Sequence, residues 1–569
     1  MPSCAHGARA SSPCELSFEW HSGDLPPGTS PYKDELLNIE FRSPRHTTYL
    51  MRGFWDGGNT LRVRFTPLEP GSWTYHTQSS IKRYDNQEVS FEVAETGAPG
   101  FPAVANLRHW WTTNKQPHLW VAAAVPFLRM DQPSFESWAD SRKHDGFSHL
   151  RGALLTSNAP SKPLGSDGQP NFAYFAALDD RLIAAVNRGF TLDLILADDS
   201  FLASRVLNDW EHRDPLIRYL IARYGGLNVT WQGIERFEDH PGGRALLKDL
   251  GALLQKYDSF QHPRSTDARV SSSPLLPDGW MTYLIEASPH PEVAAVERQF
   301  TQQPEIHVIS ATDPDAFRRE LWNATANGEY PSVAYDALRN EANLRAIRTW
   351  LKVISDTRHW EFEPYFDVSG ARAVGLEEIG FIVYAQTPGI VEITFPKHKY
   401  NPYWINPATG EEIPLKDYRG EVFSRSTPDN SHDWVLDCER EGHKESMLRS
   451  VRFESIDAPV QEIETDASKI PFEIIDPPGE QVLPGIPTPF KMKLTKTNRA
   501  TREMQFVWWG EVMSGASEGP RLLGTGASGT FTVPNEWIKE PGSTLNLRLE
   551  AINANGKAYE LDKVYRLGS

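Results

Sequence analysis

Acidic residues follow two of the apolar runs that the sequence predicts to be strands. Glu235 comes directly after the run 229–234, and Glu286 comes directly after the run 281–285. Two carboxyl groups that face each other across a cleft can cleave a bond between sugars, because one protonates the leaving oxygen while the other acts as nucleophile or base. We predict Glu235 as the general acid and Glu286 as its partner. The alternatives are a charged loop, in which Glu235 pairs with Arg236, and an ordinary cleft or surface acid at Glu286.

Other polar and aromatic side chains lie near predicted strand ends and could hold a substrate. The candidate substrate-binding residues are Asp198, Asp199, Trp231, Trp280 and His290. The two aspartates could bind hydroxyl groups, although capping of the next helix explains them equally well. The two indoles could stack on the flat apolar face of a sugar, and the histidine could make a polar contact. Packing or a surface position is the alternative for these last three.

Metal and cofactor motifs are not found in the sequence. It has no HExxH pattern, no CxxC pair and no histidines at metal-ligand spacing. No glycine-rich phosphate loop follows the first predicted strand, which disfavours a nucleotide-binding fold. We therefore predict neither a metal nor a cofactor.

The segment 103–370 alternates short apolar runs with amphipathic helices. The strand candidates are 119–127, 150–156, 190–197, 229–234, 281–285 and 306–309. Leucines at 246, 247, 250, 253 and 254 recur at the spacing of one helix face. Alternating strands and helices predict a parallel sheet, and about eight such units in roughly 250 residues favour a closed (β/α)8 barrel. Catalytic residues of such barrels lie at the carboxyl ends of the strands.

The segments on both sides of the predicted barrel alternate apolar and polar residues, as half-buried strands do. We assign 15–97 to an N-terminal β-sandwich, 375–443 to a small β-domain and 448–569 to a C-terminal Ig-like sandwich. The predicted fold class is a multidomain α/β plus all-β protein, with a central barrel flanked by β-sandwich domains. A chain of 569 residues is long enough for several such cores.

Charge and hydropathy exclude two classes of partner. The chain has 58 basic and 75 acidic side chains, a net charge of −17, and no basic run that would bind nucleic acid. No segment approaches the 18 consecutive apolar residues of a membrane span. The N-terminus lacks the apolar region of a signal peptide, so the sequence as written does not predict export. The three cysteines, Cys4, Cys14 and Cys438, do not form a disulfide scaffold, although they leave a Cys4–Cys14 bridge open.

Several motifs together resemble the apiosidase-like proteins of the glycoside hydrolase family 140 type. They are RGFWDG at 52–57, RVRF at 62–65, GSW at 71–73, NVTWQGIE at 228–235, QHPRS at 261–265, DGWM at 278–281, LWNAT at 321–325 and NPYW at 401–404. The resemblance covers about residues 18–441. It implies a β-sandwich, a barrel and a small β-domain named for collagen binding. It also implies a bacterial, extracellular or periplasmic enzyme that degrades plant polysaccharides.

The resemblance departs at the seventh predicted strand, where similar barrels carry a glutamate at the strand end. Here that position falls near Ile309 or Ser310, and Glu305 lies at the other end of the strand. We therefore hold two hypotheses. The first is a hydrolase of plant or microbial polysaccharides with Glu235 as the general acid. The second is a catalytically decayed barrel that binds carbohydrate or acts as a scaffold.

Overall fold

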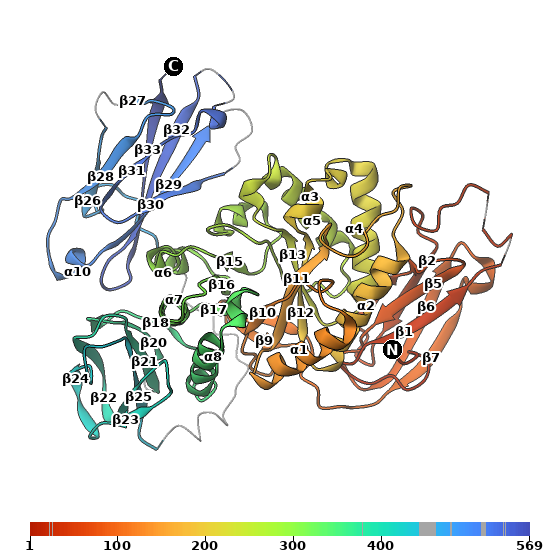
Figure 1. The fold of residues 1–569 in the computed structure, drawn as a ribbon, viewed down its shortest axis with the longest axis horizontal. Helices are drawn as coiled ribbons and strands as arrows, with labels where there is room; N and C mark the ends of the chain where they lie inside the picture. The colour runs from red at the N-terminus through yellow and green to blue at the C-terminus, as the bar shows by residue number, and fades with distance from the viewer. Residues whose placement is uncertain are drawn as a thin grey trace.

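The computed structural model describes the chain apart from residues 22, 26, 378, 443–461, 478–480, 514–518, 539, 541 and 569. An eight-stranded parallel barrel lies between antiparallel β-sheets formed by the two ends of the chain (Figure 1). This arrangement confirms the predicted fold class. The predicted boundaries at 443 and 448 lie outside the described residues, and the other domain limits stay predictions.

The N-terminal segment forms two antiparallel sheets that pack face to face. Its strands are β1 (Cys14–Glu19), β2 (Leu37–Arg42), β3 (Thr48–Arg52), β4 (Phe54–Trp55), β5 (Thr60–Phe65), β6 (Gly71–Ser79) and β7 (Glu88–Val93). They are ordered β1-β5-β4 in one sheet and β3-β2-β6-β7 in the other. Alternate residues of β1 and β2 are buried, as expected where one face of a sheet covers a core. Ile39, Phe65 and Trp73 are fully buried between the sheets.

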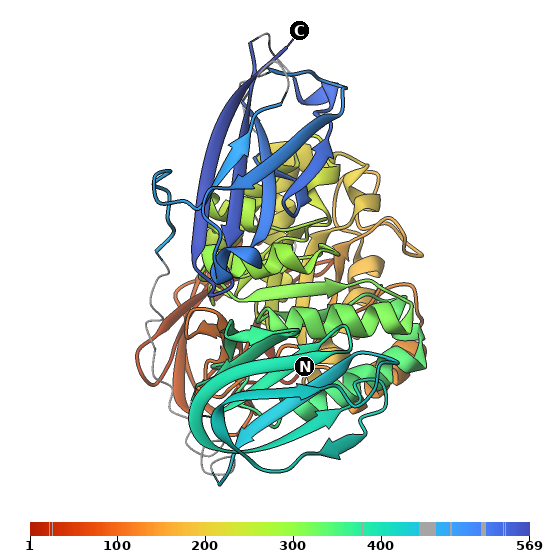
Figure 2. The same ribbon diagram turned by 90° about the vertical axis from the view of Figure 1, so that its left-hand side faces the viewer.

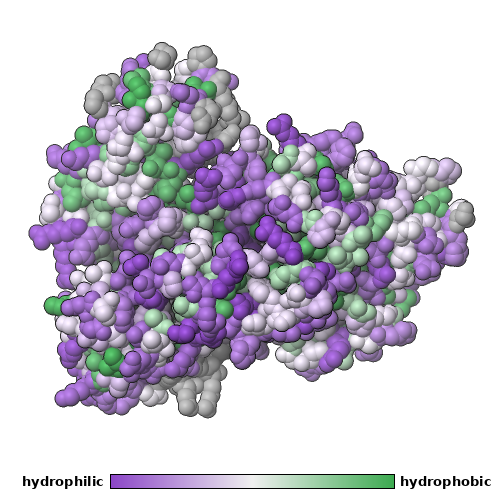
Figure 3. All heavy atoms as spheres, viewed as in Figure 1, coloured by the Kyte–Doolittle hydropathy of each residue, from purple (hydrophilic) through white to green (hydrophobic). Residues whose placement is uncertain are grey.

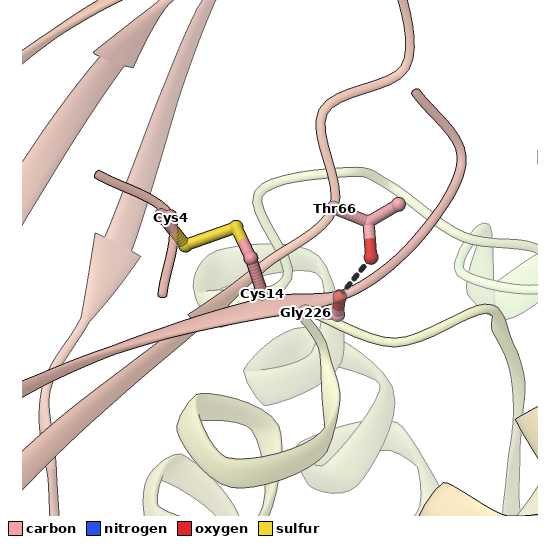
Figure 4. Close-up of a disulfide and its surroundings, with 4 residues drawn as sticks. All are labelled: Cys4, Cys14, Thr66 and Gly226. Atoms are coloured by element: carbon pink, nitrogen blue, oxygen red, sulfur yellow. Dashed lines mark hydrogen bonds between the residues drawn. A yellow bond between two sulfur atoms is a disulfide. The ribbon is translucent and has the colours of Figure 1, made fainter. Parts of the chain in front are cut away.

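A disulfide joins Cys4 to Cys14 and ties the first residues of the chain to β1 (Figure 4). The sequence left this bridge open, and the structure forms it. The third cysteine, Cys438, is buried and free.

Buried charges fix the N-terminal sandwich to the barrel. Arg64 of β5 pairs with Asp179, and its Nη1 donates to the carbonyl of Arg223 at 3.0 Å. Arg223 donates from Nε and Nη2 to the same carboxylate, at 3.0 and 2.7 Å. The hydroxyl of Thr66 also donates to the carbonyl of Gly226 at 2.6 Å (Figure 4). A Cβ at Gly226 would lie 2.2 Å from the Arg64 carbonyl oxygen, so this close approach requires glycine.

The barrel strands run parallel in the order β14-β13-β12-β11-β10-β17-β16-β15. They are β10 (Ala122–Ala124), β11 (His149–Leu155), β12 (Thr191–Ala197), β13 (Val229–Ile234), β14 (Arg264–Ser265), β15 (Leu284–Glu286), β16 (Glu305–Ile309) and β17 (Tyr330–Val333). A short hairpin, β8 (Pro102–Ala105) and β9 (His109–Thr112), precedes them. The ladder links every neighbour except β14 and β15, so the barrel is nearly closed.

Helices follow the barrel strands and cover the sheet (Figure 1). They are α1 (Gln132–His144), α2 (Phe172–Asn187), α3 (Asp199–Leu202), α4 (Trp210–Tyr224), α5 (Gly243–Tyr257), α6 (Pro291–Phe300), α7 (Pro314–Ala326) and α8 (Glu341–Ile354). The leucine repeat predicted on one helix face lies on α5 and is buried. Asp131 and Asp313 cap α1 and α7 by accepting backbone N–H groups, which fixes where each helix begins.

After the barrel, the chain forms an antiparallel sheet that packs against α7. Its strands are β18 (Glu363–Tyr365), β19 (Val368–Ser369), β20 (Arg372–Leu376), β21 (Gly380–Ala385), β22 (Ile390–Ile405), β23 (Glu412–Pro414), β24 (Tyr418–Ser426) and β25 (Trp434–Arg440). The main path is β18-β20-β21-β25-β22-β19. Arg318 of α7 donates two hydrogen bonds from Nε and Nη2 to Oδ1 of Asp433, at 2.9 and 2.6 Å. This buried pair joins the sheet to the barrel.

The C-terminal segment forms a second sandwich, which lies beside α6. Its elements are β26 (Phe472–Ile475), β27 (Gln481–Val482), β28 (Thr488–Leu494), α10 (Arg499–Arg502), β29 (Gln505–Met513), β30 (Arg521–Thr525), β31 (Ser528–Phe531), β32 (Thr544–Ile552) and β33 (Ala558–Leu567). Val293 and Val296 of α6 share a buried cluster with Val507, Trp509 and Ile552. Figure 2 shows this sandwich above the β18–β25 sheet, with the barrel helices between and behind them.

Polar residues cover most of the face in Figure 3, and hydrophobic residues form scattered patches there. Among the described residues, no helix has both the length and the apolarity needed to cross a bilayer.

Candidate active site at the mouth of the barrel

Glu235 lies at the carboxyl end of β13, where the sequence predicted it. Its backbone N–H donates to the carbonyl of Ala197, at the end of β12, at 3.1 Å. Its carboxylate Oε2 accepts a hydrogen bond of 3.2 Å from the N–H of Asp199. The side chain is half-buried. One oxygen is therefore held by the backbone while the carboxyl group remains partly open to solvent.

A second carboxylate, Asp267, follows β14 on the neighbouring strand and is nearly buried, at 7% exposure. Arg151 of β11 donates from Nη2 to Oδ1 of Asp267 at 2.5 Å. The hydroxyl of Thr266 donates to the carbonyl of Ile234 at 3.0 Å and accepts from the N–H of the same residue. Through these two hydrogen bonds, the side chain of Thr266 extends the pairing between β13 and β14 as far as the residue before Asp267.

Arg151 is itself anchored from below by a buried carboxylate, Asp193 of β12. Nε of Arg151 lies 3.8 Å from Oδ2 of Asp193. Asp193 accepts hydrogen bonds from the hydroxyls of Thr230 and Tyr283, both at 2.8 Å. Burial raises its pKa above the usual range, although Arg151 opposes the rise. The guanidinium of Arg151 thus lies between the carboxylates of Asp193 and Asp267, and it restricts the orientation of Asp267.

The two mouth carboxyls have different electrostatic environments. Burial raises the pKa of Glu235, and the negative charge of Asp267 is the next largest cause of the rise. Asp198 raises the pKa further, whereas Arg151 and His240 lower it without cancelling the rise. Asp267 has a direct ion pair with Arg151. A carboxyl whose pKa is raised, next to a carboxylate that is paired with an arginine, is the arrangement expected of an acid and its partner.

Asp198 and Asp199 both lie at this end of the barrel, and both have protein partners. Asp198 caps α3, where its carboxylate accepts from the Phe201 N–H at 3.0 Å. Asp199 pairs with Arg236 and lies 3.0 Å from Nε2 of His240. These contacts favour the capping alternative for Asp198. For Asp199 they indicate a role in holding the loop that follows Glu235.

Glu286 does not form the pair with Glu235 that the sequence predicted. Residues alternate between the two faces of a strand, and Tyr283 and Ile285 belong to the apolar cluster inside the barrel. Glu286 therefore points to the other face, toward the helices. It is 1% exposed, and its Oε2 lies 2.5 Å from Nδ1 of His307 on β16. This buried, outward position corrects the assignment of Glu286 as the catalytic partner.

The predicted stacking platforms are also corrected by the structure. Trp231 is fully buried, and its indole N–H donates to Asp258 at 3.2 Å. Trp280 is 2% exposed and packs so closely on α5 that a Cβ at Gly251 would lie 2.3 Å from its ring. Both rings are core residues that a sugar does not reach. His290 is exposed and caps α6, so its role as a polar contact stays a prediction.

A pocket of about 200 Å³ lies between the loop after Glu235 and the C-terminal sandwich. The barrel contributes His240, Arg244 and Arg269, and the sandwich contributes Arg521 and Trp537. The Arg521 guanidinium lies 4.8 Å from the centre of the Trp537 ring. Residues 237–240 of the loop that follows Glu235 line the pocket, and neither Glu235 nor Asp267 lines it.

Sequence reasoning missed Asp267 and Arg151. A weak signal was present, since Asp267 follows the QHPRS segment at 261–265 that carried part of the resemblance. The strand before it spans only Arg264–Ser265, too short for a period-2 pattern. A signal was also present for Arg151, because an arginine inside a buried strand is rarely found without a partner.

Comparisons with known proteins agree with this fold. A crystal structure described as a "putative glycoside hydrolase" from Bacteroides vulgatus ATCC 8482 is similar over 76% of this chain and 99% of its own, with a TM-score of 0.66 and 17% identity. A family 5 glycoside hydrolase structure from the same organism is similar over 60% of this chain and 94% of its own, with a TM-score of 0.52 and 14% identity. The chain has a glycoside-hydrolase-like fold.

A third structure, described as a glycoside hydrolase, covers 60% of this chain and 97% of its own, with a TM-score of 0.52 and 14% identity. Residues 12–80 match a family described as a domain of unknown function, DUF5060. This match falls on the N-terminal sandwich. No curated protein matches the chain.

Proposed function

We propose that this protein hydrolyses glycosidic bonds in a plant or microbial polysaccharide, with Glu235 as the general acid and Asp267 as its partner. The observation that carries the proposal is the mouth pair: Asp267, ion-paired to Arg151, is the largest charged contributor to the raised pKa of Glu235. The glycoside-hydrolase-like fold supports it, because catalytic residues of such barrels lie at the carboxyl ends of the strands.

In this mechanism Glu235 donates its proton to the oxygen of the leaving sugar. Asp267 supplies the negative charge that attacks the anomeric carbon or activates a water molecule. Arg151 donates a hydrogen bond to Asp267 and so restricts the orientation of its side chain. The N–H of Asp199 holds Glu235 in place through Oε2. The chemistry then uses two carboxyls from neighbouring strands, and the absence of a carboxylate at the end of β16 does not prevent it.

The substrate class follows from the resemblance of the motifs to apiosidase-like proteins, so branched pectic polysaccharides are the first substrates to test. The pocket beside the loop after Glu235 would receive part of the polysaccharide that is cleaved. The ring of Trp537 in this pocket offers a flat face on which a sugar can stack.

The test is a turnover screen on branched pectic and other plant polysaccharides, with the wild type, Glu235→Gln and Asp267→Asn. We expect each variant to lose activity by roughly 100-fold or more. Glu473→Gln is the matched control, because Glu473 is an exposed carboxylate on β26 of the C-terminal sandwich.

Aryl glycosides with good leaving groups separate the two roles, because such a leaving group needs little protonation. Glu235→Gln should recover activity on them, and Asp267→Asn should not. Full activity in Asp267→Asn would refute Asp267 as the partner. Binding of oligosaccharides without turnover on any substrate would instead favour the decayed-barrel hypothesis.

A further inference from the structure

Three buried ligand-type side chains meet on the helix-facing side of the barrel, away from the mouth. They are Glu286 at the end of β15, His307 in β16 and Glu329 immediately before β17, and one potential ligand atom of each lies within 4.8 Å of the others. Nδ1 of His307 is 2.5 Å from Oε2 of Glu286 and 3.2 Å from Oε1 of Glu329. All three side chains are at most 6% exposed.

The other nitrogen of His307 is held by a fourth carboxylate. Its Nε2 lies 3.2 Å from Oε1 of Glu320 on α7, and Oε2 of Glu320 accepts from the N–H of Ala311. When Oε1 of Glu320 accepts a hydrogen bond from Nε2–H, Nδ1 of the neutral ring carries a lone pair on the side of the other two carboxylates. Histidines that bind metals have this arrangement, with a carboxylate behind the ring.

Protein groups balance only part of the negative charge at this cluster, because a protonated His307 can offset one of the carboxylates that surround it. Oε2 of Glu329 is buried and has no hydrogen-bond partner among the residues that the structure describes. Three carboxylates surround one imidazole, and the more distant Arg372 also interacts with Glu329. The neighbouring carboxyl of Glu305 has its own partners, since Arg298 and Arg108 both interact with it. An unpaired buried carboxylate is costly, so such a cluster requires either extra protons or a cation.

We propose that Glu286, His307 and Glu329 bind one divalent transition-metal ion, such as Zn²⁺ or Mn²⁺. One imidazole and two carboxylates are a ligand set that these ions accept. The ion would join β15, β16 and β17 at one end of the strand ladder. There the N–H groups of Thr282 and Tyr283, just before β15, bond to the Arg264 carbonyl of β14, whereas β15 itself does not pair with β14. The role of the ion is therefore to stabilise the barrel, independently of the chemistry proposed at the mouth.

The test measures metal content and thermal unfolding of the full chain. Protein purified without chelator is expected to hold about one equivalent of metal after gel filtration. Removal of the metal with EDTA should lower the melting temperature by roughly 5 °C, and addition of Zn²⁺ or Mn²⁺ should restore it. Glu329→Gln and His307→Gln should lose both the bound equivalent and the response.

Glu305→Gln is the matched control, because Glu305 is a buried carboxyl on the same face of β16 but outside the triad. It should keep the metal and the response. If the wild type holds no metal and neither ion shifts its melting temperature, the proposal is overturned and protons neutralise the cluster.

Discussion

At the scale of residues, the proposed site depends on the different surroundings of two carboxyls, those of Glu235 and Asp267, which follow adjacent strands. The proton on Glu235 is favoured by burial and by the charges of Asp267 and Asp198. A general acid works only while it is protonated, so activity falls as the pH rises through its pKa. Each neighbouring negative charge therefore extends the active range upward.

The variant Asp198→Asn tests this electrostatic account without touching the proposed pair. Asparagine is also a good helix cap, so α3 should persist, whereas the negative charge near Glu235 is lost. The pKa of Glu235 should fall, and the basic limb of the pH–activity profile should move to lower pH by roughly half a unit. Asp209→Asn is the control, because Asp209 caps α4 in the same way and does not appear among the main charges acting on Glu235. An unchanged limb in Asp198→Asn would contradict the account.

At the scale of elements, one carboxylate joins the N-terminal sandwich to two barrel helices. Asp179 of α2 is buried between Arg64 of β5 and Arg223 of α4. The two arginines outweigh the effect of burial and hold the pKa of Asp179 below its usual value. Arg64 also pairs with Glu15, and Arg223 also pairs with Asp56. Asp179 is the carboxylate that these two arginines share at the interface.

We expect Asp179→Ala to lower the free energy of unfolding by about 3–5 kcal/mol, because it leaves two buried guanidinium groups without their shared partner. Denaturant unfolding measures the change. Asp180→Ala alters the next residue of the same helix, which is exposed, and should change stability by less than about 0.5 kcal/mol. Equal effects of the two substitutions would show that the buried network contributes nothing specific.

At the scale of the whole molecule, the C-terminal sandwich contributes to the pocket beside the mouth. Trp537→Ala should raise KM about tenfold on a polymeric substrate and leave kcat nearly unchanged, because stacking contributes to binding rather than to the bond-breaking step. Trp537→Phe should restore most of the loss. Trp20→Ala, at a half-buried tryptophan in the N-terminal sandwich, controls for removal of an indole. A fall in kcat alone would argue against this role.

The disulfide also concerns the molecule as a whole, because its formation depends on the compartment in which the chain folds. Disulfides persist in oxidising environments, so the bridge offers a test of the extracellular or periplasmic location that the resemblance implies. Protein isolated from such a compartment should show one reactive thiol when it is unfolded without reductant, that of Cys438, and three after reduction. Three thiols before reduction would mean that the bridge does not form there.

The sequence by itself determined the order of the elements and the position of Glu235 at the end of its strand. The change from period-2 to helical spacing marked the barrel and its β-sheet neighbours, because burial of one face imposes these periods on any strand or helix. The leucines of α5 show this helical period. Glu235 was located by a different signal, because a charged residue directly after an apolar run marks the end of a strand.

Only the tertiary structure decided which carboxyls meet. Barrel strands are buried on both faces, so an apolar run does not reveal which residues point inward. That parity directs Glu286 toward His307 and Trp231 toward Asp258, away from the lumen. The proposed partner of Glu235 depends on the register between strands, because β13 pairs with β14 and Asp267 follows β14 two residues after its last residue. The Glu286, His307 and Glu329 cluster has the same origin, because its members come from three successive strands and share no local spacing.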